Sequence, residues 1–382
     1  MSYQLTIDPL GATIEVEEGQ TVLDAALRQG IYIPHACCHG LCGTCKVQVS
    51  DGEVDHGAAN PFALMDFERD AGKTLACCCT LQSDATIEAD IDEEPDAEVI
   101  PVRDFAATVT RIVDLTPTIK ALHLQLESPT GRSRGNSSPS GGGPARSGGP
   151  GGPQFGSMHF QAGQYVQLEI PGLGQSRAFS IANAPAAVER TGEIELNVRI
   201  VAGGAGTGYL HQKLQVGQRL RLAGPYGRFF VRKSAALPML FMAGGSGLSS
   251  PRSMILDLLD AGSTLPITLV YGQRTRAELY YDDEFRALAA KHPNFSYVPA
   301  LSDEPEGSGW SGARGFVHEA AKAHVGDSFA GHKAYLCGPP PMVEACIATL
   351  MQGRLFERDI YTEKFLSAAD TNATRSPLFR SI

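Results

Sequence analysis

The sequence contains no long apolar run and no excess of basic residues. Its longest apolar stretch, ALPMLFMAGGSGL, is too short and too rich in glycine to cross a bilayer. The formal net charge of −10 argues against nucleic-acid binding, because phosphate groups attract basic surfaces. The first residues, MSYQLTIDPLG, lack the basic segment and apolar core of a secretory signal peptide. We therefore expect a cytoplasmic protein that binds neither membranes nor nucleic acids.

Three segments with different patterns predict three domains, which is a usual number for 382 residues. Residues 1–98 hold most of the cysteines and alternate strands with short helices, which predicts a compact α+β domain. Residues 103–232 show short alternating strands at turn-rich spacing, which predicts an antiparallel β-barrel. Residues 238–367 alternate strand and helix patterns, which predicts an α/β domain with a parallel sheet. Residues 368–382 form a C-terminal tail.

Two segments have a biased composition. Residues 128–157 contain no Ile, Leu, Val or Met and consist mainly of Gly, Ser, Pro and Arg. Such a segment cannot bury enough apolar surface to fold, so we expect a disordered insertion in a barrel loop. Between Asp84 and Glu98 there are eight acidic residues and no basic one. This stretch is either a solvated linker or an acidic docking surface for a partner protein.

The cysteines are concentrated near the start of the chain. Seven of the nine lie in the first 80 residues, which in a reducing compartment indicates a metal site rather than disulfides. Three of them have the spacing C-x4-C-x2-C, namely Cys37, Cys42 and Cys45. Cys38 falls out of register with these three and is expected to be a packed bystander.

This spacing, followed by a distant cysteine, is that of a plant-type [2Fe–2S] cluster. Gly40 and Gly43 would let the loop adopt positive φ and bring backbone N–H groups to the cluster sulfurs. A zinc site is the competing interpretation, but zinc usually takes paired C-x2-C units and the loop has only one. The spacing alone leaves the fourth ligand open among three adjacent residues, Cys77, Cys78 and Cys79.

Glycine-rich motifs indicate phosphate binding. The stretch GGAGTGYL has the composition of an anion-binding turn, with backbone N–H groups and the Thr207 hydroxyl available. In FMAGGSGLSSP, glycines stand between a predicted strand and a helix, although Ser250 replaces the last glycine of G-x-G-x-x-G. Arg274 and Arg276 could meet a 2′-phosphate, and no carboxylate is expected there to take a ribose 2′-OH. The residues alone therefore leave NADH and NADPH open.

Resemblance to a known family narrows the cysteine assignment. C-x4-C-G-T-C with a later L-A-C resembles the ferredoxin domain of bacterial oxygenase reductases. The resemblance implies that Cys77, which follows the L-A pair, is the fourth cluster ligand.

The stretch RAFS resembles the Arg-x-Tyr-Ser motif of the ferredoxin–NADP reductase-like superfamily, with Phe179 in place of tyrosine. GPYGRFF resembles the motif that closes the flavin barrel of this superfamily. The resemblance implies bound FAD, with Arg177 on its phosphate, Phe179 against the flavin ring and Ser180 near the reactive N5. The other implied FAD contacts are Ala178, Gly203, Gly204 and Thr207.

CGPPPM resembles the nicotinamide-side motif of the same superfamily. It implies that Cys337 lies against the nicotinamide, although a buried cysteine can also be a plain apolar residue. IYTEKF resembles the terminal segment that approaches the flavin, with Glu363 and Phe365 as contacts. Together with Ser180 and Cys337, these two make up the expected catalytic set. The implied dinucleotide contacts are Gly244, Gly245, Gly247, Arg274, Cys337, Gly338, Pro339 and Met342, and the family favours NADH.

The order of the three domains resembles the reductase components of bacterial multicomponent oxygenases, above all those of phenol hydroxylases. The stretches that carry this likeness are IYIPHACCHGLCGTCK, NPFALMDFERD, AGGSGLSSP and MQGRLFERDI. The resemblance implies electron transfer from NADH through FAD and the cluster to a di-iron hydroxylase, with a small effector protein. Alternatives are the reductase of a Rieske dioxygenase or of a toluene monooxygenase, or a non-enzymatic redox sensor. The insertion at residues 128–157 departs from the family.

Overall fold

The computed structural model describes residues 1–91, 94–128 and 156–365. The expected disorder of the insertion and the expected C-terminal tail therefore lie almost entirely outside the described residues. None of the helices in the described segments combines the length and the apolar character that crossing a membrane requires.

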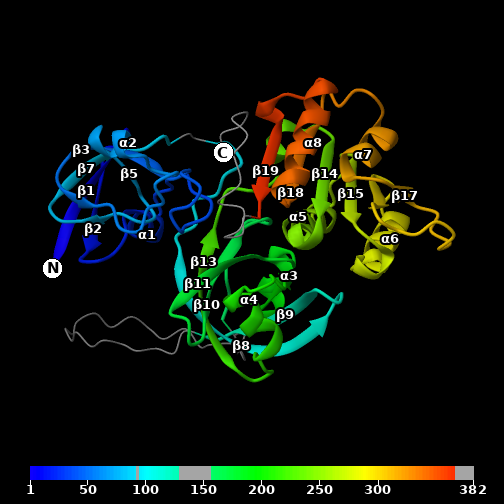
Figure 1. The fold of residues 1–382 in the computed structure, drawn as a ribbon, viewed down its shortest axis with the longest axis horizontal. Coiled ribbons are helices and arrows are strands. Elements are labelled where there is room, and N and C mark those ends of the chain that lie inside the picture. The colour runs from blue at the N-terminus through cyan, green and yellow to red at the C-terminus, as the bar shows by residue number, and fades with distance from the viewer. Residues whose placement is uncertain (92–93, 129–155, 366–382) are drawn as a thin grey trace, which may run out of the picture.

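Three sheets follow one another along the chain, within residues 2–88, 103–226 and 239–364. We call the three parts the N-terminal domain, the barrel and the C-terminal domain (Figure 1). The predicted combination of an α+β domain, an antiparallel barrel and a parallel α/β domain is confirmed.

The N-terminal domain has a five-stranded sheet in the order β2-β1-β7-β3-β5. Helix α1 (Val22–Arg28) begins at Thr21, whose hydroxyl accepts a bond from the Asp24 N–H, and five of its seven residues are buried. The second helix is α2 (Asp66–Asp70). The strands of the sheet are β1 (Ser2–Asp8), β2 (Ala12–Glu17), β3 (Lys46–Asp51), β5 (Lys73–Leu75) and β7 (Ala85–Glu88), and β4 (Val54–Asp55) pairs with β6 (Thr80–Leu81).

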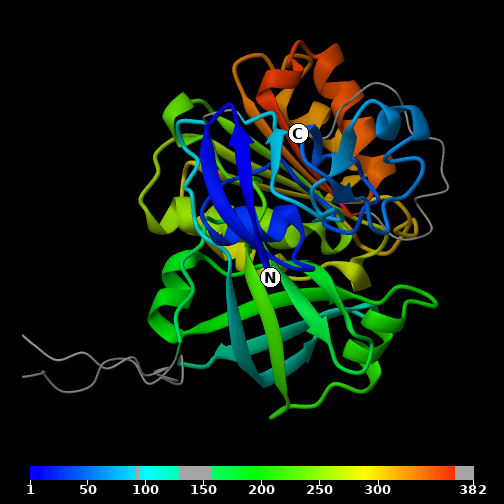
Figure 2. The same ribbon diagram turned by 90° about the vertical axis from the view of Figure 1, so that its left-hand side faces the viewer.

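The barrel is an antiparallel sheet in the order β11-β10-β13-β8-β9-β12, seen from the side in Figure 2. A bridge between Ile181 and Leu196 joins its two outer strands and closes it. Side chains such as Val166 and Leu168 alternate into its core. Its elements are β8 (Arg103–Asp114), β9 (Ile119–Leu126), β10 (Tyr165–Ile170), β11 (Gln175–Ser180), β12 (Glu193–Arg199), β13 (Arg219–Tyr226), α3 (Pro185–Thr191) and α4 (Ala205–Gln212).

The C-terminal domain has a parallel sheet in the order β17-β16-β15-β14-β18-β19. Its central strands are apolar throughout because helices cover both faces, α5 and α6 on one and α7 and α8 on the other. Its elements are β14 (Met239–Gly244), α5 (Ser249–Asp260), β15 (Ile267–Gln273), α6 (Asp282–Lys291), β16 (Phe295–Leu301), β17 (Ala313–Arg314), α7 (Val317–Val325), β18 (Lys333–Gly338), α8 (Pro340–Gln352) and β19 (Ile360–Lys364).

The acidic segment between the N-terminal domain and the barrel is held by specific contacts. The Glu94 carboxylate pairs with Arg232 at 2.8 Å, and the Arg232 guanidinium lies between the rings of Phe230 and Tyr361, 4.0 and 3.9 Å from their centres. The Asp96 carboxylate accepts bonds from the backbone N–H and the hydroxyl of Ser234. Both expectations for this segment, free linker and exposed docking surface, are wrong for Glu94 and Asp96.

Candidate redox site

The cysteine loop, residues 37–45, brings its thiols together in pairs. The side chains of Cys37 and Cys42 are in contact, and the Cys77 thiol contacts Cys45 as well as its neighbour Cys78. The backbone N–H groups of His39 and Leu41 both donate to Cys37 Sγ at 3.4 Å. The loop can turn back in this way because Gly40 and Gly43 have φ values of 72° and 76°, which confirms the prediction for these glycines.

This arrangement fits a two-iron cluster better than a single metal ion. In the described parts of the chain, no three His, Cys, Asp or Glu side chains converge as one metal ion would require. A [2Fe–2S] cluster instead takes two thiolates per iron, which two pairs provide. Cys78 Sγ lies 3.6 Å from Cys77 Sγ, whereas Cys79 is fully buried in the apolar core. The geometry therefore suits the cluster that the spacing predicts.

Cys38 is more than a packed bystander. Its φ of 57° turns the chain, and its Sγ lies 3.3 Å from the hydroxyl of Tyr165 on β10 of the barrel. The same hydroxyl donates to the Ala36 carbonyl at 2.9 Å. No sequence pattern points to Tyr165, because 127 residues separate it from Cys38.

On the barrel, Arg177 lies over the first turn of α4. A side chain at Gly206 would meet Arg177 Cγ at 3.3 Å, so this glycine, which sequence reasoning passed over, makes room for the arginine. The Arg177 guanidinium donates only to neutral oxygens, those of Ser176 and Gln175, and forms no ion pair within the described residues. A cation without a carboxylate partner beside a helix N-terminus suits a phosphate.

The predicted anion-binding turn is the start of helix α4, with Gly204 as its N-cap and Gly203 at a φ of 71°. Thr207 also contributes to the turn itself. Its hydroxyl oxygen accepts a bond from the Val201 N–H at 3.0 Å and so stabilises the turn itself. The backbone N–H groups remain the suitable phosphate donors of this turn.

An unsatisfied amide marks the strand next to the RAFS stretch. Gln167 on β10 is buried, and apart from an approach to the Cys38 thiol its amide nitrogen and oxygen make no hydrogen bond among the described residues. It stands opposite Ala178, which is exposed, and two residues from Tyr165. A buried amide normally has hydrogen-bond partners, and the polar edge of a flavin would supply one.

Where the barrel meets the C-terminal domain, three side chains bond to one carboxylate oxygen, Glu363 Oε2. Ser250 Oγ donates at 2.6 Å, Ser180 Oγ at 3.3 Å and Cys337 Sγ at 3.4 Å. Burial of the carboxylate raises the pKa of Glu363, and the three bonds oppose that rise. Burial also raises the pKa of Cys337, which therefore stays a neutral thiol. Sequence reasoning had treated Ser250 only as a departure from a glycine motif.

The glycines at the end of β14 serve close packing. A side chain at Gly244 would clash with Met342 Sδ, and one at Gly247 with the backbone of Cys337. Gly338, with a φ of 152°, likewise has no room for a side chain beside Met342 and Gly244. These residues let the loop after β18 lie directly against the start of α5.

Phe365 and Pro339 extend the same region. Phe365 follows β19, donates its N–H to the Gly338 carbonyl at 3.1 Å and packs on the apolar core. Pro339 is the N-cap of α8. The structure thus brings Cys337, Gly338, Glu363 and Phe365 close together.

Arg274 does have a carboxylate neighbour. Asp303, after β16, accepts a bond from Arg274 Nε at 3.1 Å, and Glu304 accepts one from the Arg276 N–H at 2.8 Å. The expectation that no carboxylate stands here is wrong, because β15 and β16 are adjacent parallel strands whose ends meet.

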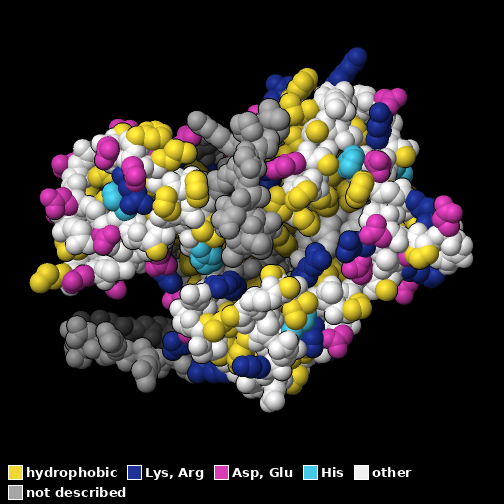
Figure 3. All heavy atoms as spheres, viewed as in Figure 1, with side chains coloured by type: hydrophobic (Ala, Val, Ile, Leu, Met, Phe, Trp, Pro, Cys, Tyr) yellow, Lys and Arg dark blue, Asp and Glu magenta, His cyan; other side chains and the backbone are white. Residues whose placement is uncertain are grey.

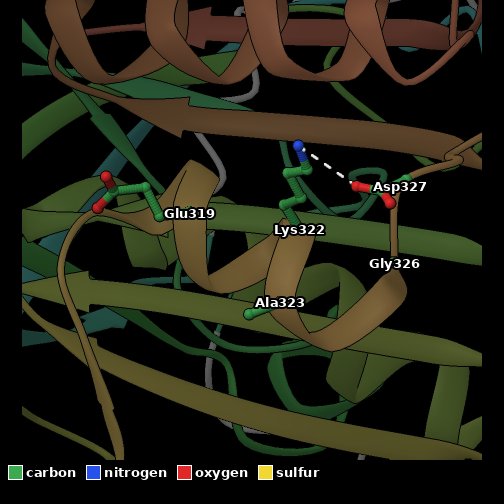
Figure 4. A pocket seen from close by; sticks show the side chains of 5 residues that line it. All are labelled: Glu319, Lys322, Ala323, Gly326 and Asp327. Carbon is green, nitrogen blue, oxygen red and sulfur yellow. Dashed lines mark ion pairs between the residues drawn. The ribbon is translucent and has the colours of Figure 1, made fainter.

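A surface hollow of about 420 Å³ lies on α7, away from all of these residues (Figure 4). It is lined by Glu319, Lys322, Ala323, Gly326 and Asp327; Lys322 pairs with Asp327 at 3.3 Å, and Glu319 accepts a bond from the Phe316 N–H. None of the predicted site residues contributes to it.

Comparison with known families assigns each domain. Residues 5–82 match the 2Fe-2S iron-sulfur cluster binding domain, residues 153–231 the oxidoreductase FAD-binding domain and residues 241–347 the oxidoreductase NAD-binding domain. The chain is 55% identical, over 100% of both chains, to the reductase component of phenol 2-monooxygenase from Pseudomonas sp. strain CF600. It belongs to the reductase components of multicomponent oxygenases. This reductase is an oxidoreductase whose cofactors are FAD, a [2Fe–2S] cluster and NADH.

Other relatives agree over the full length. The phenol hydroxylase P5 protein of Acinetobacter pittii is 53% identical over 100% of both chains. Among solved structures, the Amycolatopsis cytochrome P450 reductase has a TM-score of 0.80 at 34% identity and covers 95% of this chain and 98% of its own. The ferredoxin reductase in carbazole 1,9a-dioxygenase has a TM-score of 0.74 at 25% identity, with 96% and 99% covered.

Proposed function

We propose that the reductase supplies electrons to a phenol hydroxylase-type monooxygenase in the cytoplasm. NADH provides a hydride, FAD takes up the electron pair and releases it one electron at a time, and the [2Fe–2S] cluster carries these electrons to a di-iron hydroxylase assisted by a small effector protein. The observation that carries this proposal is the identity of 55% to a phenol 2-monooxygenase reductase, over 100% of both chains.

For the cluster, we propose Cys37 and Cys42 as the ligands of one iron and Cys45 and Cys77 as those of the other. The pairing of the thiols supports this assignment. The N–H bonds to Cys37 Sγ would stabilise the negative charge of the cluster.

For FAD, the proposed phosphate site is Arg177 with the N-terminal turn of α4, including Gly203 and Gly204. Ala178 and Phe179 border the flavin ring, and Gln167 bonds to its polar edge. Thr207 acts by holding the turn.

The reacting ends of the flavin and the nicotinamide are proposed to meet at Glu363. Ser180 and Glu363 provide bonding groups at the flavin side, and the neutral Cys337 thiol lies against the nicotinamide ring. Phe365 closes the site. The junction between the barrel and the C-terminal domain supports this placement, because groups from both domains bond to one oxygen there.

For the rest of the dinucleotide, the proposed contacts are Gly244, Gly245, Gly247, Gly338, Pro339 and Met342. The carboxylates that follow β16 favour NADH over NADPH. Asp303 neutralises Arg274, and Glu304 adds a second carboxylate, so a 2′-phosphate would meet negative charge. A ribose 2′-OH can instead donate to such a carboxylate.

The hydroxylase is proposed to dock beside the cysteine loop, on an apolar patch formed by Phe62, Met65 and Phe67. These side chains are 76%, 47% and 67% exposed. Their segment covers the loop, since the Asn60 N–H donates to the Gly40 carbonyl at 3.1 Å. Figure 3 shows hydrophobic side chains gathered at the surface around α2. An acceptor of single electrons must come close to the cluster, and large exposed apolar groups mark interaction sites.

Reconstitution tests the function. The purified holoprotein, mixed in air with the hydroxylase and effector protein of a phenol hydroxylase, should convert phenol to a catechol while O2 and NADH are consumed together. The same assay with the components of a toluene monooxygenase or a Rieske dioxygenase should give far less product. Higher turnover with either of these would replace the proposed partner.

Substitutions in the apolar patch test the docking site. Phe62→Ser and Phe67→Ser should each raise the reductase concentration needed for half-maximal hydroxylation about tenfold, as expected for interface anchors. Phe356→Ser, at a residue that is 56% exposed on the C-terminal domain, is the matched control. Ferricyanide reduction by NADH should stay unchanged in all three, because it needs no docking. Equal hydroxylation by all variants would place the hydroxylase elsewhere.

A further inference from the structure

The contact between Tyr165 and the cysteine loop joins the two proposed redox sites directly. Tyr165 is 5% exposed and lies on β10, where Ser180 stands opposite it in β11 and Tyr226 opposite it in β13. Its hydroxyl reaches out of the barrel to Ala36 and Cys38. One rung of the barrel sheet therefore carries both a proposed flavin contact, Ser180, and the residue that contacts the loop.

The hydrogen bonds define how the hydroxyl is used. A phenol has one proton to donate, and Tyr165 gives it to the Ala36 carbonyl at 2.9 Å. The Cys38 Sγ lies 3.3 Å from the same hydroxyl oxygen, in a contact where either atom can be the donor, and the thiol also approaches the Ala36 carbonyl at 3.9 Å. Ala36 and Cys38 flank Cys37, so the hydroxyl holds the chain on both sides of a proposed iron ligand.

Aromatic packing makes the barrel side of this contact rigid. The Tyr165 ring stacks on Tyr226 with centres 5.6 Å apart and an interplanar angle of 19°. Tyr226 in turn meets the edge of His35, two residues before Cys37, at 6.2 Å and 85°. Beside them the Arg228 guanidinium lies 3.8 Å above the ring of Tyr32, another residue of the N-terminal domain. The tyrosine thus has little freedom to follow a moving loop.

We infer that Tyr165 is a positioning residue that holds the cluster loop at a fixed place against the flavin barrel. This inference rests on the proposed electron path from FAD to the cluster. Transfer between the two groups depends steeply on their separation, so a loop held from both sides of Cys37 keeps that step fast. Cys38 shares the hydroxyl, which gives this cysteine a role without iron ligation.

Hydrogen exchange in the holoprotein tests the contact without any electron flow. In Tyr165→Phe, which keeps the ring stack, amides of residues 34–45 should exchange about fivefold faster, the factor expected for the net worth of one hydrogen bond. Tyr3→Phe is the matched control, because the Tyr3 hydroxyl has no hydrogen-bond partner among the described residues. Exchange of residues 34–45 in Tyr165→Phe at the wild-type rate would overturn the inference.

A double substitution tests whether Cys38 shares the contact. If the thiol acts only through the hydroxyl, Tyr165→Phe combined with Cys38→Ala should exchange no faster at residues 34–45 than Tyr165→Phe alone. Additive effects of the two substitutions would refute the shared contact. Iron content and the electron paramagnetic resonance spectrum of the reduced cluster should match those of the wild type.

Anaerobic stopped-flow mixing with NADH then separates the two electron-transfer steps. Flavin reduction by NADH should keep its wild-type rate in Tyr165→Phe, and the later reduction of the cluster should become slower. Equal slowing of both steps would refute a specific role at the loop. If NADH did not reduce the cluster of the wild-type protein at all, the proposed function would be refuted. The hydrogen-exchange result would still test the contact of Tyr165, because it needs no electron flow.

Discussion

Cys337 and Glu363 stand directly opposite each other in the parallel strands β18 and β19, and the Cys337 thiol donates to Glu363 Oε2 at 3.4 Å. Ser250 and Ser180 donate to the same oxygen from α5 and β11. A carboxylate that three groups from three elements hold in common is tied to the relative position of the barrel and the C-terminal domain. Its ionisation should therefore be visible in both stability and rate.

Glu363→Gln should change how stability depends on pH. Burial raises the pKa of Glu363, so the folded protein binds this proton more tightly than the unfolded chain does. Stability is therefore lost as the pH rises from the ordinary carboxyl pKa through the raised one. Melting temperatures should be measured from about pH 4 to pH 8, the range in which a buried carboxyl titrates. They should fall less steeply with rising pH for Glu363→Gln than for the wild type. Parallel curves would contradict a buried, titrating Glu363.

Ser250→Ala should make the stability of the protein depend more steeply on pH, the opposite of the effect of Glu363→Gln. The Ser250 hydroxyl bonds to the ionised carboxylate at 2.6 Å and lowers its pKa, so its removal should raise the pKa of Glu363 further. The loss of stability at neutral pH should be about 2 kcal/mol, the usual worth of a bond to a charged group. Urea titrations at pH 5 and pH 8, within roughly the same carboxyl range, should show a larger loss at the higher pH.

Cys77 should differ from Cys79 and Cys38 in its effect on the cluster. Cys77→Ser should abolish the visible absorption and the acid-labile sulfide, because it removes the thiol that contacts Cys45. Cys79→Ser should keep both, since Cys79 is fully buried in the core, and Cys38→Ser should keep both as well. Loss of the cluster in Cys79→Ser with retention in Cys77→Ser would overturn the assignment.

Arg232→Ala should destabilise the protein through the acidic segment. It removes the ion pair to Glu94 and the guanidinium between Phe230 and Tyr361, and only 10% of the Arg232 side chain is exposed. We expect a loss of about 2–3 kcal/mol, somewhat below the cost of breaking a fully buried pair. The control is Lys233→Ala, whose side chain is 53% exposed and whose pair with Asp257 should contribute about 0–1 kcal/mol. Chemical denaturation compares the two, and equal losses would contradict a special role for Arg232.

Asp303→Ala should relax the preference for NADH. It frees Arg274 and removes a negative charge from the place where a 2′-phosphate would lie. The ratio of kcat/KM for NADPH over that for NADH should rise about tenfold, which corresponds to ~1.4 kcal/mol. Asp327→Ala, which breaks the exposed pair with Lys322 on α7, should leave the ratio unchanged. An unchanged ratio in Asp303→Ala would show that this edge of the sheet does not determine the choice between NADH and NADPH.

Sequence reasoning succeeded where the signal is local. The spacing of Cys37, Cys42 and Cys45, the turn glycines of their loop and the alternation of strands and helices all depend on residues close together in the chain. These patterns predicted the three folds. Cys337, Gly338, Glu363 and Phe365 were singled out as site residues by family resemblance.

The remaining site residues depend on contacts between distant segments. Tyr165 meets Cys38 and Asp303 meets Arg274 only because separate strands end side by side. Ser250 gains its partner through the packing of α5 against β19. The acidic segment was misjudged for the same reason, since a run of carboxylates gives no sign of the Arg232 that receives one of them.

The anchoring of Glu94 and Asp96 also limits how modules of such reductases can be exchanged. A chimera joined near residue 90 would combine a foreign iron–sulfur module with a native segment that is already bound to Arg232 and Ser234. A chimera joined after Val102 would bring a foreign segment without these carboxylates, so Arg232 and Ser234 would lose their hydrogen-bond partners. Shuffling should therefore work best when Glu94, Asp96, Arg232 and Ser234 are inherited from the same parent.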